Sequence, residues 1–458
     1  MIRFIIVALL LLTTFRGSCQ TVVDSIFAKS SNIEISSIAI KDSLFLKIHY
    51  PLLAKYQYFW LPKDGGLKET DLKELDEKAI IAITKTTKGI TYYYLTKNSK
   101  KIELSTIQVL NHGTKSLLND PVEIDGRFVG SYVDSALHIL TFNKKEKFVL
   151  TDTQFKEGAK MEETDFPLSI NLSNYKVWQI ALIDEGGYQS PLQSKALVKI
   201  YNRKKDLVVV ADDPFQQFKN EQNTFFTTTV VQIDKQTRKA VTNTLFEQRQ
   251  ENFRSIVRGE YLFKLIYDTH NKIDGIELGV FQLVNMKNKK IQHIPFKTVN
   301  KFARLGDANR TVELFPEGKK RRKVDAGKNP SPFLLIDSLS NKNLVLMLGS
   351  NFEPSLGIPL VGAGGIALFF ITASMQDVGW GGSNQLYTYL SGDLKNDFAE
   401  IDLRNFSPGV IDQFEMAKDD ADQRYTYKGY ARFNNKTFCF YLPKKTKFVR
   451  IMTFPTTR

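Results

Sequence analysis

The sequence predicts an all-β protein, and we expect a β-propeller of six to eight divergent blades. Short apolar runs rich in β-branched and aromatic residues alternate with polar turns through most of the chain, which is the pattern of strands joined by hairpins. Helix-like periodicity is scarce. Turn centres near residues 144, 204, 235, 287 and 341 recur at intervals of roughly 30 to 60 residues, a spacing typical of propeller blades.

Five hairpins support this fold. In each of them, two strand-like runs flank a turn rich in Asn, Asp or Lys, and such polar turns reverse the chain between antiparallel strands. The predicted strand pairs are 136–142 with 147–150, 196–201 with 206–210, 227–233 with 240–246, 281–284 with 291–296, and 430–433 with 438–442.

Only two segments show the periodicity of a short amphipathic helix. Residues 70–83 would place four apolar side chains on one side of such a helix: Leu72, Leu75, Ala79 and Ile80. Residues 408–418 form the second candidate. Because helices do not alternate regularly with the strand-like runs, a βαβ fold is not expected.

The length of the chain bears on its domain organisation. Single hydrophobic cores stop growing at about 250–300 residues, and this chain has 458 residues. A repeat architecture avoids one large core, so we expect residues 20–458 to form a single propeller-like domain. The alternative is two β-sandwich domains in tandem, with a boundary near residues 160–170.

Residues 1–19 are predicted to be a secretory signal peptide. Arg3 provides a positive start, residues 4–12 are an unbroken apolar run, and residues 17–19 are small. This order is typical of a cleavable signal, and the run is shorter than the roughly 20 residues of a transmembrane helix. The sequence therefore predicts an exported protein in the periplasm, at the outer-membrane surface or outside the cell.

Cys19 has two interpretations. The segment Gly17-Ser18-Cys19 resembles the end of a bacterial lipobox, and this resemblance implies lipidation of the cysteine and a membrane-anchored lipoprotein. A lipobox has a leucine-like residue three places before the cysteine, where this chain has Arg16. We therefore favour ordinary cleavage after Cys19. The remaining cysteine, Cys439, lies in an apolar run and is expected to be a buried core residue.

The chain is basic, with a net charge of +14 from 63 Lys and Arg against 49 Asp and Glu. The basic residues are spread over predicted turns, which favours a solvated lysine-rich surface, and no nucleic-acid partner is expected. The run of five basic residues at 319–323 lies among proline and glycine residues and is predicted to be an exposed loop.

The sequence's candidate binding residues lie in one glycine-rich segment. Trp380 is followed by Gly381 and Gly382, and Asn384 comes two residues later. An aromatic face in a polar loop can stack on a sugar ring. The alternative is a turn whose tryptophan folds back onto the core.

Other motifs do not indicate a cofactor or a metal. Gly362, Gly364 and Ala367 fit a dinucleotide-binding pattern, but a strand-like run follows them where that site requires a helix. The acidic pairs 184–185 and 212–213 are expected in solvated turns.

The five histidines lack the spacing of a zinc site. His49 and His138 fall inside strand-like runs and are expected to be core or edge residues.

No catalytic motif emerges, since the chain has neither a G-x-S-x-G elbow nor a phosphate-binding loop. The sequence therefore predicts an exported cell-envelope binding or scaffold protein that contacts a protein or glycan partner. The enzyme alternative is an exported carbohydrate-active hydrolase that uses paired carboxylates. The third alternative is a structural lipoprotein, which would contact a membrane only through a lipid on Cys19.

Overall fold

The computed structural model describes most of the chain after residue 20. The described residues are 21–63, 65–98, 101–111, 113–142, 148–175, 179–184, 196–213, 226–247, 252–267, 275–300, 304–305, 308–311, 331–336, 344–352, 384–392, 397–400, 425–433, 436–443 and 446–455. They form seven β-sheets, which we name A to G. Helix in these residues is limited to short turns: η1 (Pro51–Leu53), η2 (Lys73–Leu75), η3 (Leu172–Asn174) and α3 (Phe296–Asn300).

Sheet A joins the first described strand to the last three, in the order β1-β32-β31-β30. Its strands are β1 (Thr21–Phe27), β30 (Tyr425–Phe433), β31 (Lys436–Pro443) and β32 (Phe448–Pro455).

Sheets B, C and D follow in chain order. Sheet B contains β2 (Glu34–Ile40), β3 (Ser43–Tyr50), β4 (Lys55–Pro62) and β5 (Lys68–Thr70). Sheet C contains β6 (Ala79–Lys85), β7 (Gly89–Asn98), β8 (Lys101–Leu110), β9 (Lys115–Leu117) and β10 (Val122–Ile124). Sheet D contains β11 (Arg127–Val133), β12 (Leu137–Phe142), β13 (Val149–Lys156) and β14 (Ala159–Pro167).

Sheets E, F and G complete the series, and sheet E differs from the others because it pairs β15 with β16 in parallel. Sheet E contains β15 (Ile180–Asp184), β16 (Val198–Asn202), β17 (Asp206–Asp213), β18 (Phe226–Asp234) and β19 (Ala240–Glu247). Sheet F contains β20 (Asn252–Arg258), β21 (Tyr261–Tyr267), β22 (Gly275–Gln282) and β23 (Asn288–Pro295). Sheet G contains β24 (Arg304–Leu305), β25 (Ala308–Thr311), β26 (Ser331–Ile336), β27 (Leu344–Phe352), β28 (Asn384–Gly392) and β29 (Ala399–Glu400).

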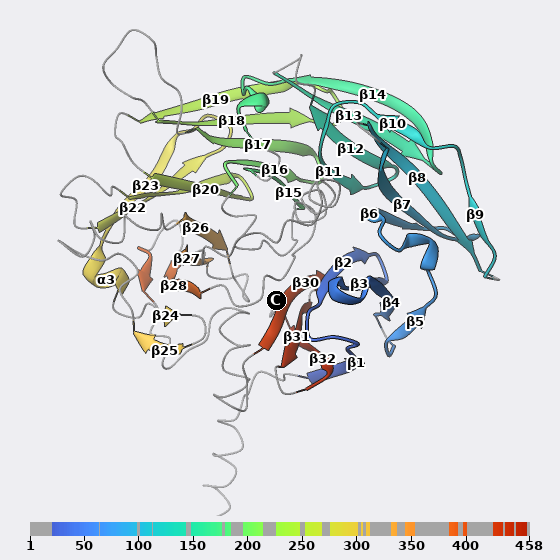
Figure 1. Cartoon of the computed structure of the whole chain (residues 1–458). Helices are drawn as coiled ribbons and strands as arrows, with labels where there is room; N and C mark the ends of the chain where they lie inside the picture. The colour runs from blue at the N-terminus through green and yellow to red at the C-terminus, as the bar shows by residue number, and fades with distance from the viewer. Residues whose placement is uncertain are drawn as a thin grey trace, which may run out of the picture.

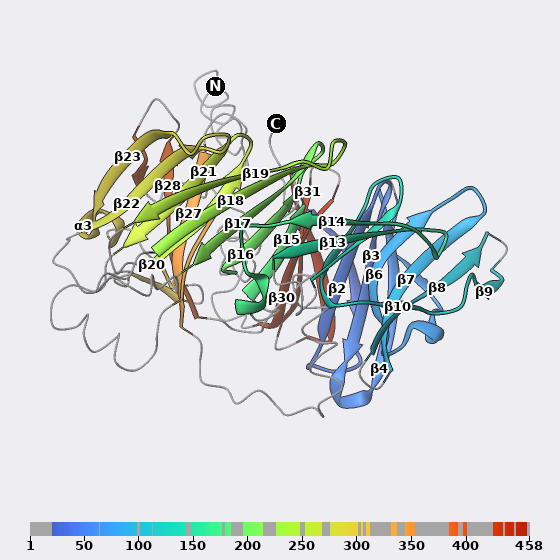
Figure 2. The ribbon, with the colours of Figure 1, turned by 90° about the horizontal axis from the view of Figure 1, so that it is seen from above.

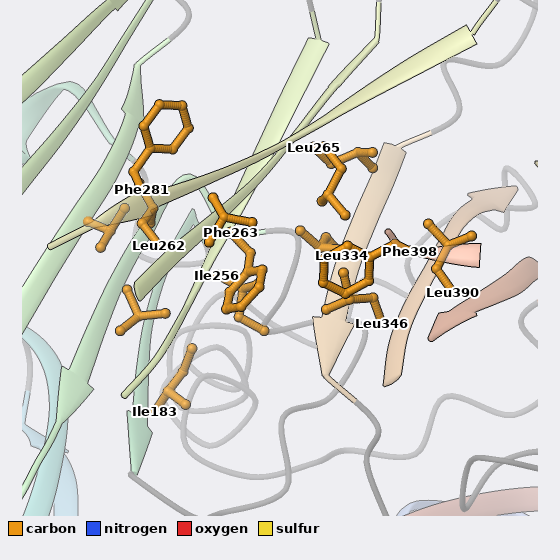
Figure 3. Close-up of a cluster of buried hydrophobic side chains, with 14 of the residues drawn as sticks. Ile183, Ile256, Leu262, Phe263, Leu265, Phe281, Leu334, Leu346, Leu390 and Phe398 are labelled. Carbon is orange, nitrogen blue, oxygen red and sulfur yellow. The ribbon is translucent and has the colours of Figure 1, made fainter. Parts of the chain in front are cut away.

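Hydrophobic clusters join each sheet to the next around a ring (Figure 1). Separate clusters lie between sheets A and B, B and C, C and D, and D and E. A further cluster contains residues of sheets E, F, G and A. Figure 3 shows Phe263 of sheet F near Leu334 of sheet G and near Phe398, which directly precedes β29. Pairing of β1 with β32 then holds the two ends of the ring in one sheet. This arrangement is that of a β-propeller.

The inner strands are apolar on both faces because each sheet is covered by a neighbour on either side. In β17, Val208 and Val210 join the cluster shared with sheet F, whereas Leu207 and Val209 join the cluster shared with sheet D. All four are at most 1% exposed. Alternate side chains of a strand point to opposite faces, so a strand packed on both sides reads as a continuous apolar run.

The connections between strands form two faces of the ring, because successive antiparallel strands run in opposite directions. One face, here called the hairpin face, carries the turns β2–β3, β6–β7, β11–β12, β16–β17 and β20–β21, each of two or three residues. The other face, here called the opposite face, carries the turn between β3 and β4 and the segment 71–78 between β5 and β6. The β3–β4 turn lies at the lower edge of Figure 2.

The structure confirms the predicted all-β propeller, with seven sheets in the described residues. The five predicted hairpins are confirmed as β12–β13, β16–β17, β18–β19, β22–β23 and β30–β31. The alternative domain boundary is expected near residues 160–170, and β14 (Ala159–Pro167) occupies most of this range.

The helix predicted over 70–83 is wrong. These residues form the end of β5, the turn η2 and most of β6. Leu72, Leu75 and Ile80 are buried as expected, but between sheets B and C. The isoleucines of this segment favour extended backbone because branching at Cβ restricts their rotamers in a helix. The second predicted helix, 408–418, lies outside the described residues.

Candidate functional site

Two leucines project from the tip of the β3–β4 turn. The 3-10 turn η1 buries none of its residues; Leu52 is 76% exposed and Leu53 is 43% exposed. Pro51 favours this turn because its φ is already fixed at a helical value. Ala54 ends the turn in the left-handed region, at φ 47°, which costs an L-residue about 1 kcal/mol. The backbone therefore holds both leucines outward.

Beneath this tip, side chains of β3 and β4 are layered. His49 and Tyr56 are directly paired across the two strands, and their rings stack with centroids 4.5 Å apart and planes 7° apart. The Nζ atom of Lys47 lies 4.6 Å from the centroid of the Tyr56 ring. Residues two apart on a strand share a face with their cross-strand partners. The Tyr56 ring is thus covered by an imidazole and by an ammonium group.

Polar contacts fix these layers in place. The Nδ1 atom of His49 lies 2.9 Å from Oε2 of Glu34 on β2. Lys47 donates hydrogen bonds of 3.2 and 2.7 Å to two backbone carbonyls of the segment 71–78. Burial lowers the pKa of Lys47 to about 8 and raises the pKa of Tyr56 to about 12. The base of the turn is therefore rigid and polar, while its tip is apolar.

Three exposed phenylalanines of the described residues lie on the opposite face of the ring, which also carries the β3–β4 turn. Phe27 ends β1 and is 54% exposed, and it pairs with Phe448 at the start of β32, which is 47% exposed. The two rings meet edge to face, with centroids 5.6 Å apart. Phe148, which directly precedes β13, is 51% exposed. Sheets A, B and D therefore all present apolar side chains on this face.

A second polar cluster lies inside sheet D, around His138. Its Nδ1 atom is 2.9 Å from Oδ2 of Asp152, and its Nε2 atom is 3.1 Å from Oδ1 of Asp134. The His138 ring stacks on Tyr132, with centroids 4.4 Å apart, and Nζ of Lys235 from sheet E lies 4.7 Å from the same Tyr132 ring. An imidazole held by two carboxylates favours its protonated form. This cluster fastens sheet D to sheet E.

The third cluster, around Asp212, connects sheets E and F. Asp212 is 1% exposed and accepts hydrogen bonds from Ser255 N (2.9 Å), Ser255 Oγ (2.8 Å) and Thr228 Oγ1 (3.0 Å). Lys199 is fully buried, its Nζ lies 3.6 Å from Asp212 Oδ2, and this ammonium has no hydrogen-bond partner. The expectation that Asp212 lies in a solvated turn is wrong, because three protein donors replace water around its carboxylate.

The acidic pairs of the sequence do not come together. Asp184 lies exposed at the end of β15 and accepts a 2.8 Å hydrogen bond from Asn202. The strand register places Asn202 opposite Leu207, at the far end of β17 from Asp212. Asp184 and Asp212 are therefore at opposite ends of sheet E.

Most of the predicted binding segment lies outside the described residues. Cys19, Trp380, Gly381 and Gly382 are not described, and Asn384 begins β28, where it pairs with Phe352 of β27. The glycine pattern at 362–367 and the basic run at 319–323 are also outside the described residues.

The strand positions of the histidines and of Cys439 agree with expectation. His138 is 7% exposed in β12, His49 is half-buried in β3, and Cys439 is fully buried in β31. Sequence reasoning missed Leu52 and Leu53. The signal that would have found them is a Pro-Leu-Leu segment between two aromatic strand-like runs, which places apolar residues in a turn.

The described part of the chain contains no group of three His, Cys, Asp or Glu side chains that could hold a metal ion. Nor do the described residues include a helix long and apolar enough to cross a membrane.

Comparisons with known proteins give no family assignment. No protein-family model matches the chain, and no curated protein sequence matches it. Among solved structures, the chain is similar to the β-propeller domain of the Trilobed protease from Pyrococcus furiosus, with a TM-score of 0.38 and 9% identity over 92% of this chain and 95% of that one. It is also similar to Kuenenia stuttgartiensis hydrazine synthase, with a TM-score of 0.29 and 9% identity over 80% of this chain and 77% of that one. A third similar structure is the WD40 domain of SCAP from fission yeast, with a TM-score of 0.30 and 8% identity over 71% of this chain and 96% of that one. These weak similarities carry no functional argument.

Proposed function

We propose that this protein is an exported binding or scaffold protein of the cell envelope, and that it contacts a partner protein through the β3–β4 turn. The observation that supports this proposal is the outward projection of Leu52 and Leu53 from a turn with a rigid base. Exposed apolar groups on a pre-organised element are typical of an interaction surface, because little conformational entropy is lost when they are covered.

The geometry favours a protein over a glycan as the partner. A sugar ring needs a free aromatic face on which to stack. The Tyr56 ring is already engaged, since it stacks on His49 and has the Lys47 ammonium group 4.6 Å from its centroid. The groups that a partner meets first are the two leucine side chains at the tip, and these suit an apolar pocket on a protein.

The exposed areas of Leu52 and Leu53 set the expected contribution of these side chains to the binding free energy. Full burial of a leucine contributes about 1.5–3 kcal/mol. Since Leu52 and Leu53 are 76% and 43% exposed, covering both contributes about 2–3 kcal/mol. This corresponds to roughly a 30- to 150-fold change in Kd.

Site-specific photo-crosslinking in the native host tests the proposal. A benzophenone amino acid is introduced at Leu52, and a matched one at Thr87, an exposed turn residue on the hairpin face. We expect a discrete protein adduct from position 52 that Leu53→Asp abolishes, and none from position 87. No adduct at position 52, or the same adduct from both positions, would overturn the proposal.

The partner identified in this way then allows an affinity measurement. Leu52→Asp combined with Leu53→Asp should weaken binding at least 30-fold, whereas Lys73→Asp, at an exposed position in the segment 71–78 of the same face, should change it less than threefold. Export itself is tested by the mass of the mature N-terminus. A first residue of Gln20 supports ordinary cleavage, a lipidated Cys19 supports the lipoprotein alternative, and an intact Met1 contradicts export through a cleaved signal.

A further inference from the structure

We propose that the hairpin face of the ring lies against an anionic lipid bilayer. This inference goes beyond the partner site, because it concerns the other face of the molecule. It rests on the charge of the turns, on their flatness and on the place where β1 begins.

Two turns of sheet E form one basic surface. Lys204, Lys205 and Lys239 are exposed on the turns β16–β17 and β18–β19. The backbone N–H of Lys235 donates to the carbonyl of Lys205 at 3.1 Å, so the two turns are fixed side by side. Asp234, whose carboxylate accepts hydrogen bonds from backbone N–H groups of its own turn, adds one negative charge beside these three lysines.

Sheets B and C add positive charge on the same face. Lys41 and Lys63 lie on turns of sheet B, and Lys85 and Lys88 lie at the turn β6–β7 of sheet C; all four are exposed. Among the described residues of these turns, Asp42 is the acidic residue beside them, and it pairs with Lys85 at 2.7 Å. The positive charge is thus distributed over separate parts of the ring.

One segment of the opposite face is acidic instead. In the segment 71–78, Asp71, Glu74 and Glu77 are exposed against one exposed lysine, Lys73. An anionic surface would repel this segment and attract the hairpin face.

The hairpin face is also flat. Its described turns contain two to five residues each, so none of the turns that the structure describes on this face is a long loop. Val284 is 55% exposed within the turn β22–β23, and Val133 is 42% exposed at the end of β11. A broad, flat, basic surface with small apolar side chains suits a planar bilayer, whereas a glycan chain suits a groove.

The first described strand starts on this face. Thr21 pairs with Thr453, near the end of β32, and the end of β32 and the start of β31 both lie on the hairpin face. Cys19 is two residues before Thr21. Two residues span at most about 7 Å. Under the lipoprotein alternative, a lipid on Cys19 would therefore be held close to this face, and a lipid chain together with basic residues gives stable membrane attachment.

Vesicle binding tests the inference. The purified full chain, with its N-terminal residue determined by mass spectrometry, is sedimented with vesicles of phosphatidylglycerol and phosphatidylcholine in equal amounts, or with phosphatidylcholine alone. We expect binding to the anionic vesicles that exceeds binding to the neutral ones at least tenfold and that falls as the salt concentration rises, because salt screens exposed charges.

Two triple variants with the same change in net charge locate the surface. Lys204→Glu, Lys205→Glu and Lys239→Glu together should reduce binding to anionic vesicles at least tenfold. The control, Lys29→Glu, Lys55→Glu and Lys447→Glu, changes exposed residues of the opposite face and should leave it within threefold.

Three outcomes would overturn the inference: equal binding to both vesicle types, equal loss in both triple variants, or binding to a soluble polyanionic glycan without binding to vesicles. None of these outcomes bears on crosslinking from Leu52, so failure here is distinguishable from failure of the proposed partner site.

Discussion

Replacement of Lys199 by methionine is expected to stabilise the protein. The ammonium group of Lys199 is fully buried and has no hydrogen-bond partner. Burial lowers the pKa of Lys199 from 10.5 to about 8, although the charge of Asp212 opposes this shift. Methionine has a similar length and fills the same volume without a charge. The three hydrogen bonds that Asp212 accepts from Ser255 and Thr228 remain in the variant.

The size and sign of the effect follow from proton linkage. The fall of the Lys199 pKa from 10.5 to about 8 corresponds to a cost of about 3 kcal/mol for the buried charge at pH 7. Between pH 8 and 10.5 the unfolded state binds more protons at this site than the folded state, so the stability of the native protein should rise with pH across that window. Lys199→Met should therefore raise the free energy of unfolding by about 2–3 kcal/mol at pH 7, and its advantage should shrink towards pH 10.

Urea unfolding at pH 7, 8, 9 and 10, followed by tryptophan fluorescence, measures this difference. Lys205→Met, an exposed change in the same sheet, should alter stability by less than about 0.5 kcal/mol at every pH. Each variant is compared with the native protein at the same pH. This comparison removes the contribution of Lys47, whose pKa is also about 8, because Lys47 is present in both proteins. A loss of stability in Lys199→Met at pH 7, or an advantage that stays constant up to pH 10, would refute the reasoning.

Three further predictions concern other positions. Burial lowers the pKa of His138, but the hydrogen bond and charge of Asp152 and the charge of Asp134 raise this pKa overall above 6.5. The contribution of His138 to the stability of the native protein should therefore be complete below about pH 6.5 and decline as the pH rises through the raised pKa. His138→Gln should cost about 3 kcal/mol at pH 6 and less at pH 9, measured by urea unfolding, and equal costs at the two pH values would contradict it. Ala54→Gly should raise stability by about 0.5–1 kcal/mol, because glycine accepts the positive φ of 47° without strain, and a lowered Tm would contradict it. Gly130→Ala should lower stability by about 1–3 kcal/mol in the same assay, since a Cβ there would lie 2.8 Å from the side chain of Leu182, and an unchanged midpoint would show that sheets D and E adjust.

The fold could be predicted because its signals are local. The turn Asp234–Lys239 between two runs of β-branched residues produced the hairpin β18–β19, and each such hairpin depends on fewer than about twenty residues of sequence. The failure at 70–83 has the opposite cause. Leu72, Leu75 and Ile80 fit helical spacing, but their burial is decided by the gap between sheets B and C, which no short window of sequence contains.

The polar clusters could not be predicted, because their members meet only when neighbouring strands and sheets are in register. Asp212 and Ser255 are 43 residues apart and belong to different sheets. Asp152 reaches His138 across adjacent strands, although His138 is paired with Gln154 in the register. The sequence shows which polar residues are present, but which of them form hydrogen bonds with one another depends on the register and order of the strands and sheets.

These clusters help to explain how seven divergent sheets take one order around the ring. Apolar sheet faces are alike, so burial alone discriminates poorly between correct and incorrect neighbours. A buried polar group requires a specific partner, because leaving it unpaired costs about 1–3 kcal/mol. If any sheet other than F packed beside sheet E, Asp212 would lose the hydrogen bonds that Ser255 donates. If any sheet other than C followed sheet B, Lys47 would lose the backbone carbonyls of the segment 71–78.

The same requirement bears on the proposed partner site. Lys47 also covers the Tyr56 ring beneath the leucine tip, so the contact that selects sheet C as the neighbour of sheet B also makes the base of the β3–β4 turn rigid. The partner site therefore depends on correct ring order. Lys47→Met should remove two hydrogen bonds and loosen that base, which weakens partner binding even though Leu52 and Leu53 are unchanged. A variant that lost stability but kept full affinity for the partner would separate the two roles and contradict this link.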